Sequence, residues 1–239
     1  MGSSISTWIC RRCLQIFSPV FSFFVSLEVK DEALAARWMA RESRIDYRAF
    51  RQGIDRAENV MPRLQYATSR LSDLPLHIFE RSVRPVTPSE VRRVARKVRA
   101  GLVIVDYLQM MAPDERNPSR EREVAEMSRS FKQMALDLSI PVLILAQLNR
   151  QAEAGQREPR LSDLRESGAI EQDADIVMFL HSPNKQQSLS ISPVKVKVAK
   201  GRSSGTGEAW LKFEKPFQHF SEDMRGMDET QPETQDNGL

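Results

Sequence analysis

Three apolar runs in this chain of 239 residues each end in a polar side chain that could take part in chemistry. The runs are residues 20–27 before Glu28, residues 102–105 before Asp106, and residues 142–146 before Gln147. Carboxylate oxygens are ligands that Mg²⁺ prefers, and Mg²⁺ is often shared between one or two carboxylates and substrate phosphates. Asp106 is therefore a candidate to hold Mg²⁺ against the phosphates of a nucleotide.

The elements that must position these groups are predicted to be buried parallel strands. The runs are rich in Val, Ile, Leu and Phe and do not alternate with polar residues, a pattern typical of strands covered on both faces. In open α/β sheets, ligands bind at the carboxyl ends of such strands. A core strand that merely ends in a polar cap would give the same pattern at Asp106. Two neighbouring strands with polar ends favour a site instead.

Composition and charge narrow the class of protein. The residues are 41% hydrophobic, enough for a sizeable core in a chain of this length. A net charge of +3 and a pI near 9.0 are compatible with nucleic-acid binding without requiring it. Cys10 and Cys13 are the only cysteines, which excludes a disulfide framework and predicts a reducing, cytoplasmic location. No second ligand pair follows them at a spacing that suits zinc.

The N-terminal run from residue 14 to residue 27 superficially resembles a signal peptide, because Arg11 and Arg12 precede it. Polar residues and Pro19 interrupt the run, and it is too short to span a bilayer. We therefore expect a buried strand here and no membrane association.

Helical patterns separate the apolar runs. Apolar residues at helical spacing follow Glu28, and the sequence Thr87-Pro88-Ser89-Glu90 is a capping box with proline at the first helical position. Further segments are predicted as helices at 47–53, 56–72, 88–99 and 121–138, and as a short strand at the sheet edge at 76–79.

The second half of the chain offers two groups of residues that could meet phosphates. The segment 161–175 combines a helix cap with Arg165 and Gly168, so backbone amides and a guanidinium can face phosphates before a strand at 176–180. Residues 194–199 and 209–213 predict a hairpin with Lys200 and Arg202 at its tip. Beyond Phe220 the chain is polar and acidic, which predicts a disordered tail.

From about residue 19 to residue 220, the chain resembles the C-terminal, RecA-like ATPase domain of the DnaB family of replicative helicases. The resemblance rests on five motifs in order: 26–28 (Ser-Leu-Glu), 105–109 (Val-Asp-Tyr-Leu-Gln), 146–150 (Ala-Gln-Leu-Asn-Arg), 162–175, and 200–202 (Lys-Gly-Arg). It implies a P-loop NTPase fold, a three-layer α/β sandwich with a mainly parallel central sheet. It also implies ATP and Mg²⁺ as cofactors, and a homo-hexameric ring that translocates on single-stranded DNA. Primase and a helicase loader are the further partners that it implies.

The same resemblance implies a role for each matching residue. Glu28 matches the residue that polarises the attacking water, Asp106 the magnesium partner, and Gln147 the amide that senses the γ-phosphate. Lys200 and Arg202 match the pair that reaches the nucleotide of the neighbouring subunit. The loop that holds single-stranded DNA is matched by Arg165, Glu166 and Gly168.

One part of the family pattern is absent. None of the ten glycines is followed by lysine, so the sequence has no G-x-x-x-x-G-K-[ST] loop to cradle phosphates. We therefore expect an N-terminally truncated domain, with residues 1–18 unmatched, the helicase domain at 19–220 and a tail at 221–239. Two functions stay open: an ATP-dependent DNA helicase, or a catalytically inactive paralogue that acts as a DNA- or ring-binding module. A recombinase of the wider RecA class is less favoured, because the Arg165-Glu166-Ser167-Gly168 segment is helicase-like.

Overall fold

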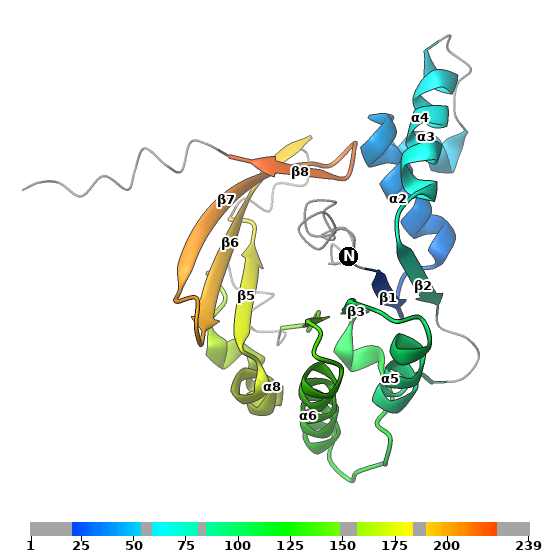
Figure 1. The fold of residues 1–239 in the computed structure, drawn as a ribbon. Coiled ribbons are helices and arrows are strands. Elements are labelled where there is room, and N and C mark those ends of the chain that lie inside the picture. Colours follow the sequence, from blue (N-terminus) through cyan, green and yellow to red (C-terminus); the bar gives the residue numbers. More distant parts are fainter. Residues whose placement is uncertain (1–20, 54–58, 81–84, 149–156, 184–189, 224–239) are drawn as a thin grey trace, which may run out of the picture.

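The structure is a computed structural model that describes residues 21–53, 59–80, 85–148, 157–183 and 190–223 (Figure 1). Its strands form two four-stranded sheets, one parallel and one antiparallel. Residues 1–18, with Cys10 and Cys13, lie outside the described residues. Among the residues that are described, no helix is long and apolar enough to cross a membrane.

The first sheet contains the three predicted strands and the predicted edge strand. Its order is β2 (Leu76–Glu80), β1 (Ser22–Ser26), β3 (Leu102–Asp106) and β4 (Val142–Ile144). Every neighbouring pair is parallel. All residues of β1 and β3 are buried, as their uninterrupted apolar sequences predicted.

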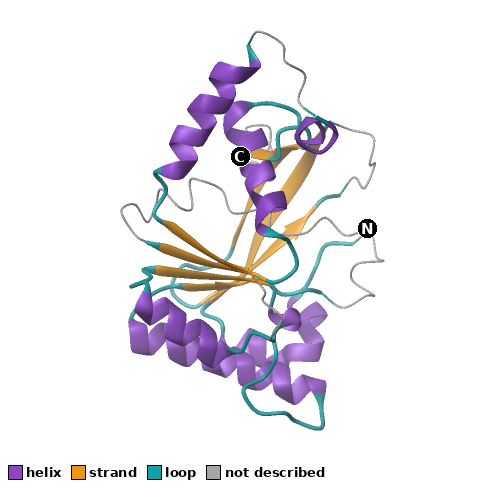
Figure 2. Cartoon of the chain, turned by 90° about the vertical axis from the view of Figure 1, so that its right-hand side faces the viewer, coloured by secondary structure: helices purple, strands orange, loops and turns teal. Residues whose placement is uncertain are grey.

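Helices cover both faces of this sheet (Figure 2). On one face, Phe23 and Val105 pack with side chains of α5 (Pro88–Lys97) and α6 (Arg120–Leu138). On the other, Phe24 and Ile104 pack with Leu34 of α2 (Asp31–Ser43). The predicted three-layer α/β fold is therefore confirmed. The predicted helices at 47–53, 88–99 and 121–138 are also confirmed, with small differences at their ends.

Two local features explain where the helices lie. The Thr87 hydroxyl accepts the Glu90 N–H at 3.3 Å, which is the first hydrogen bond of the predicted capping box. The segments α3 (Tyr47–Gln52) and α4 (Val60–Ser72) follow α2, and α4 packs against it. Part of the predicted helix 56–72 lies outside the described residues, because residues 54–58 are not described.

The prediction that residues 142–146 form a wholly buried strand was wrong. The strand β4 covers only Val142–Ile144, and Leu143 is 37% exposed. The reason is its place in the sheet, since β4 pairs with β3 on one side only and is an edge strand. Its apolar sequence did not distinguish a central strand from an edge strand.

The second sheet contains β5 (Ile176–His181), β6 (Ile191–Gly201), β7 (Gly207–Glu214) and β8 (His219–Glu222), in that order. The predicted hairpin is confirmed as β6 and β7. Gly201 is needed at its tip, because a Cβ there would lie 2.2 Å from the Gly205 carbonyl oxygen. The predicted tail begins too early: Glu222 belongs to β8, and the buried Asp223 pairs with Lys212 at 3.4 Å. Residues 224–239 lie outside the described residues.

Candidate functional site

The carboxyl ends of β1, β3 and β4 meet at one edge of the parallel sheet. Ser26 of β1 lies opposite Asp106 of β3. Just beyond the strands, the Leu27 N–H donates to the Asp106 carbonyl at 2.9 Å, and the Leu108 N–H donates to the Leu145 carbonyl at 2.9 Å. Backbone hydrogen bonds therefore connect the three loops that carry the three predicted site residues.

The two carboxylates at this edge differ in environment. Asp106 is only 1% exposed, whereas Glu28 is exposed on the loop after β1. The hydroxyl of Ser26 donates to the Val29 carbonyl and so shapes the turn that carries Glu28. Burial of a carboxylate is costly unless the group is paired or binds a metal. Asp106 thus has the placement of a metal ligand, and Glu28 the placement of a group that water can reach.

Gln147 is positioned by a residue that sequence reasoning did not assign to the site. The side-chain amide of Gln109 accepts the Gln147 N–H at 3.2 Å and donates to the Gln147 carbonyl at 3.3 Å. Arg120, at the start of α6, donates to the Gln109 carbonyl at 2.8 Å. Gln109 follows β3 in the 3₁₀ helix η2 (Leu108–Met110). Its place in the motif 105–109 was the only available signal, and that motif alone does not reveal its partner.

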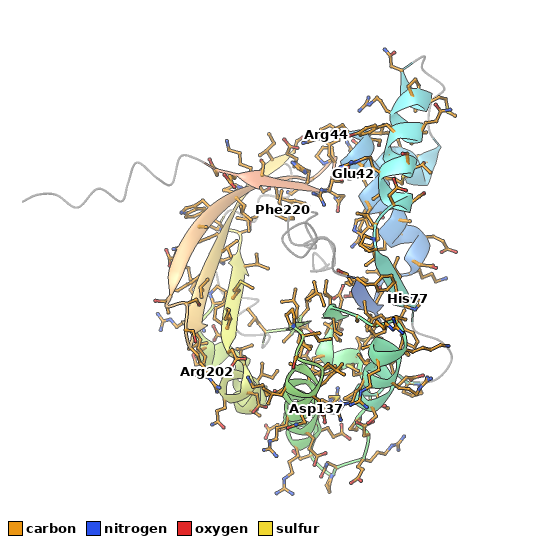
Figure 3. The ribbon with its side chains drawn as sticks, in the orientation of Figure 1. Glu42, Arg44, His77, Asp137, Arg202 and Phe220 are labelled. Carbon is orange, nitrogen blue, oxygen red and sulfur yellow. The ribbon has the colours of Figure 1, made fainter. Side chains whose placement is uncertain are left out.

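The two predicted cations of the hairpin lie at the tip of the second sheet. Lys200 and Arg202 both donate to carbonyl groups at the C-terminal end of α8 (Gly168–Asp173). Figure 3 shows Arg202 beside this helix. The guanidinium of Arg202 also pairs with Asp175 at 3.3 Å. In this structure, therefore, the two cations contact their own chain.

The predicted DNA-facing segment is the 3₁₀ helix η3 (Leu161–Ser167), which continues directly into α8. The side chains of Arg165 and Glu166 lie outside the described residues, and Gly168 is exposed at the start of α8. Asp163 is 4% exposed and accepts hydrogen bonds from Arg157 at 2.7 and 2.8 Å. The Arg157 hydrogen bonds hold the pKa of Asp163 below its usual value. The Asp163 carboxylate therefore holds the segment in place from inside.

A parallel sheet between two helical layers, with a buried aspartate and an exposed glutamate at its carboxyl edge, is the architecture of RecA-like ATPase domains. A solved structure whose title describes the ATPase domain of another protein superimposes on this chain with a TM-score of 0.81 at 28% identity. The match covers 91% of this chain and 80% of that one. The class of fold predicted from the motifs is confirmed.

The family model described as "DnaB-like helicase C terminal domain" matches residues 3–222. The chain therefore belongs to this family. The match begins at residue 3, so it includes nearly all of residues 1–18, the segment that we expected to fall outside the family pattern. The motifs that we recognised begin only at residue 26, which is why the sequence reading placed the boundary later than the family model does.

Among curated proteins, the replicative DNA helicase DnaB of Leifsonia xyli is 34% identical over 228 residues, which are 93% of this chain and 50% of that protein. The DnaB of Geobacillus stearothermophilus is also 34% identical, over 86% of this chain and 46% of that protein. A solved structure of a DnaB-like replicative helicase, titled for its interactions with primase, gives a TM-score of 0.77 at 31% identity, over 84% of this chain and 50% of that one. The chain thus spans about half the length of these relatives.

Proposed function

We propose that this chain is the ATP-dependent motor domain of a replicative DNA helicase, which unwinds duplex DNA by moving along single-stranded DNA in a hexameric ring in the cytoplasm. The observation that carries this proposal is the shared edge of β1, β3 and β4, at which Glu28, Asp106 and Gln147 follow three hydrogen-bonded strand ends. Family membership and the similarity to DnaB proteins support it.

Asp106 is the residue that would hold Mg²⁺. Among the described residues, no three His, Cys, Asp or Glu side chains cluster as a self-contained metal site. This fits Mg²⁺, which is commonly held by one or two carboxylates together with substrate phosphates. Bound there, Mg²⁺ would neutralise charge on the β- and γ-phosphates of ATP.

The remaining roles follow from the position of each residue. Glu28 is exposed, so its carboxylate can orient a water molecule for attack on the γ-phosphate. The exposed amide of Gln147 senses that phosphate, while Gln109 holds the Gln147 backbone. Lys200 and Arg202 act on the nucleotide of a neighbouring subunit. Arg165, Glu166 and Gly168 face DNA, with Glu166 orienting Arg165, because a carboxylate does not bind phosphate directly.

ATP hydrolysis tests the catalytic part of the proposal. Because no glycine in the chain precedes a lysine, we expect turnover by the purified chain alone to be near background. Mixed with a family member that has a complete phosphate-binding loop, the chain should support faster hydrolysis than its Arg202→Ala variant. Equal rates in the two mixtures would rule out the trans-acting role and leave the non-catalytic module. Robust turnover by the chain alone would show that its own residues complete the cradle.

Salt dependence of DNA binding tests the DNA-facing segment. Each phosphate contact contributes about 0.7 to the slope of log affinity against log salt concentration for single strands. Arg165→Ala should therefore reduce the slope for oligothymidylate by roughly that amount. The matched control is Arg93→Ala, which removes an exposed arginine from α5 and should leave the slope unchanged. Equal slopes for Arg165→Ala and the unmodified chain would contradict the role of Arg165.

A further inference from the structure

The tip of the β6–β7 hairpin is attached to the end of α8. Lys200 Nζ donates to the Glu171 carbonyl, and Arg202 Nη2 donates to the Gln172 carbonyl at 2.6 Å. The last carbonyl groups of a helix lack partners within it and carry partial negative charge, so they attract cations. These carbonyls lie about one helical turn after Gly168, the first residue of α8. The cations therefore contact the helix that continues the DNA-facing segment.

Asp175, two residues beyond α8, holds Arg202 at two further points. Its carboxylate pairs with Arg202 Nη1 at 3.3 Å, and its backbone carbonyl accepts the Arg202 N–H at 2.9 Å. The same carboxylate accepts Lys132 Nζ of α6 at 2.6 and 2.7 Å. The Lys132 hydrogen bond lowers the pKa of Asp175, so this carboxylate is ionised near neutral pH. Asp175 thus connects α6, the end of α8 and the hairpin tip.

The contact between Asp175 and Arg202 is exposed to solvent. The side chain of Arg202 is 51% exposed and that of Asp175 is 57% exposed. Ion pairs with this exposure are weak and are screened by salt. The contact can therefore orient the guanidinium, yet it can be exchanged for a stronger, charge-assisted contact with a phosphate.

We propose that Asp175 is a positioning residue that links the DNA-facing segment to Arg202. This inference rests on the roles of η3 and Arg202 proposed above. While Asp175 and Gln172 hold the guanidinium, Arg202 is directed toward its own chain. DNA that displaces η3 also displaces α8, because η3 runs directly into it. That displacement weakens the contacts that hold Arg202 and frees its guanidinium for the nucleotide of a neighbouring subunit.

The experiment follows the Arg202 side chain by NMR in the full chain, without any need for ATP turnover. The chain is labelled with ¹⁵N-arginine, and the Arg202 guanidinium signal is assigned by its loss in Arg202→Lys. The rotation rate of the guanidinium is then measured with and without saturating oligothymidylate. In the unmodified chain, DNA should raise this rate about threefold, the size expected for loss of an exposed ion pair.

Asp175→Asn should give the faster rate already without DNA and should show little further response to it. The matched control is Asp173→Asn, since Asp173 contacts Ser128 at 2.7 Å and lies in the same segment. This control should respond to DNA as the unmodified chain does. Rescue by Asp175→Glu, which restores the carboxylate, would further support a positioning role.

Two results would overturn the inference. One is DNA binding with no change in the Arg202 signal of the unmodified chain, and the other is an equal response to DNA in Asp175→Asn. Failure of the proposed function would look different, because the chain would then not bind oligothymidylate at all. In that case the link to DNA is also wrong, and Asp175 only stabilises the hairpin tip.

Discussion

The proposed site residues of this chain are held in two different ways. At the carboxyl edge of the parallel sheet, Asp106 is 1% exposed and its loop is tied to its neighbours by backbone hydrogen bonds. At the tip of the antiparallel sheet, Arg202 is half exposed and is held largely by side-chain contacts to α8 and Asp175. The first region is built for a fixed geometry. The second region is built for contacts that can be exchanged.

This difference follows from the energetics of the contacts. Buried apolar side chains and backbone hydrogen bonds are lost only when the sheet unfolds, whereas an exposed ion pair contributes about 1 kcal/mol or less. Groups that position a metal and water benefit from rigidity. A cation that must leave its own chain for a neighbour's nucleotide needs weak contacts at home.

The largest effect should come from the core of the parallel sheet. Phe23 is fully buried between β1, α5 and α6, so Phe23→Ala should lower the free energy of unfolding by about 3–5 kcal/mol. Urea unfolding measures this change. The comparison is Phe213→Ala in the antiparallel sheet, which removes a partly buried ring stacked on Phe220 at 4.3 Å and should have a smaller effect. Equal losses would show that the two sheets are equally well packed.

The next effect concerns the turn that separates Lys200 from Arg202. Gly201→Ala places a methyl group 2.2 Å from the Gly205 carbonyl oxygen, so the hairpin tip must shift, at a cost of about 1–3 kcal/mol. Thermal and urea unfolding measure this loss. Gly207→Ala is the matched control, because nothing lies within 4 Å of a Cβ at that position. A control variant as unstable as Gly201→Ala would mean that loss of glycine itself, rather than the close approach, is responsible.

Asp163 should make stability depend on pH. Asp163→Asn weakens the contact with Arg157 and should lower the free energy of unfolding by about 1–3 kcal/mol at pH 7. Because folding lowers the pKa of Asp163 below 3.8, its contribution is complete above about pH 5. It is lost as pH falls below 3.8 and through the lower pKa of the folded state. Urea unfolding should therefore show a smaller difference between the two chains at pH 3, and an equal difference at both pH values would contradict this assignment.

The smallest effect should come from Asp175. Its carboxylate is 57% exposed, so Asp175→Asn should change the free energy of unfolding by less than about 1 kcal/mol. Urea unfolding at low and high salt measures the change, which should shrink further as salt screens the charges. A loss as large as that of Asp163→Asn would show that Asp175 is a structural residue rather than part of an exchangeable contact.

The strands of the parallel sheet could be predicted because their sequences allow few alternatives. Residues 102–105 and 22–25 are apolar almost without interruption, and such runs require cover on both faces. The same pattern failed for β4, since Leu143 lies on an edge strand and is exposed. Hydrophobicity reports that a strand prefers burial, but the order of strands in the sheet decides how much burial it obtains.

By itself, the sequence determined the fold class, the family and the residue types at each strand end, because these depend on local patterns such as apolar runs, the capping box and ordered motifs. Only the tertiary structure decided the partners. It placed the Gln109 amide on the Gln147 backbone and the Arg202 guanidinium on Gln172 and Asp175. These contacts join residues about 30 or more positions apart, and the geometry of a hydrogen bond between such residues exists only after the sheets and helices have packed.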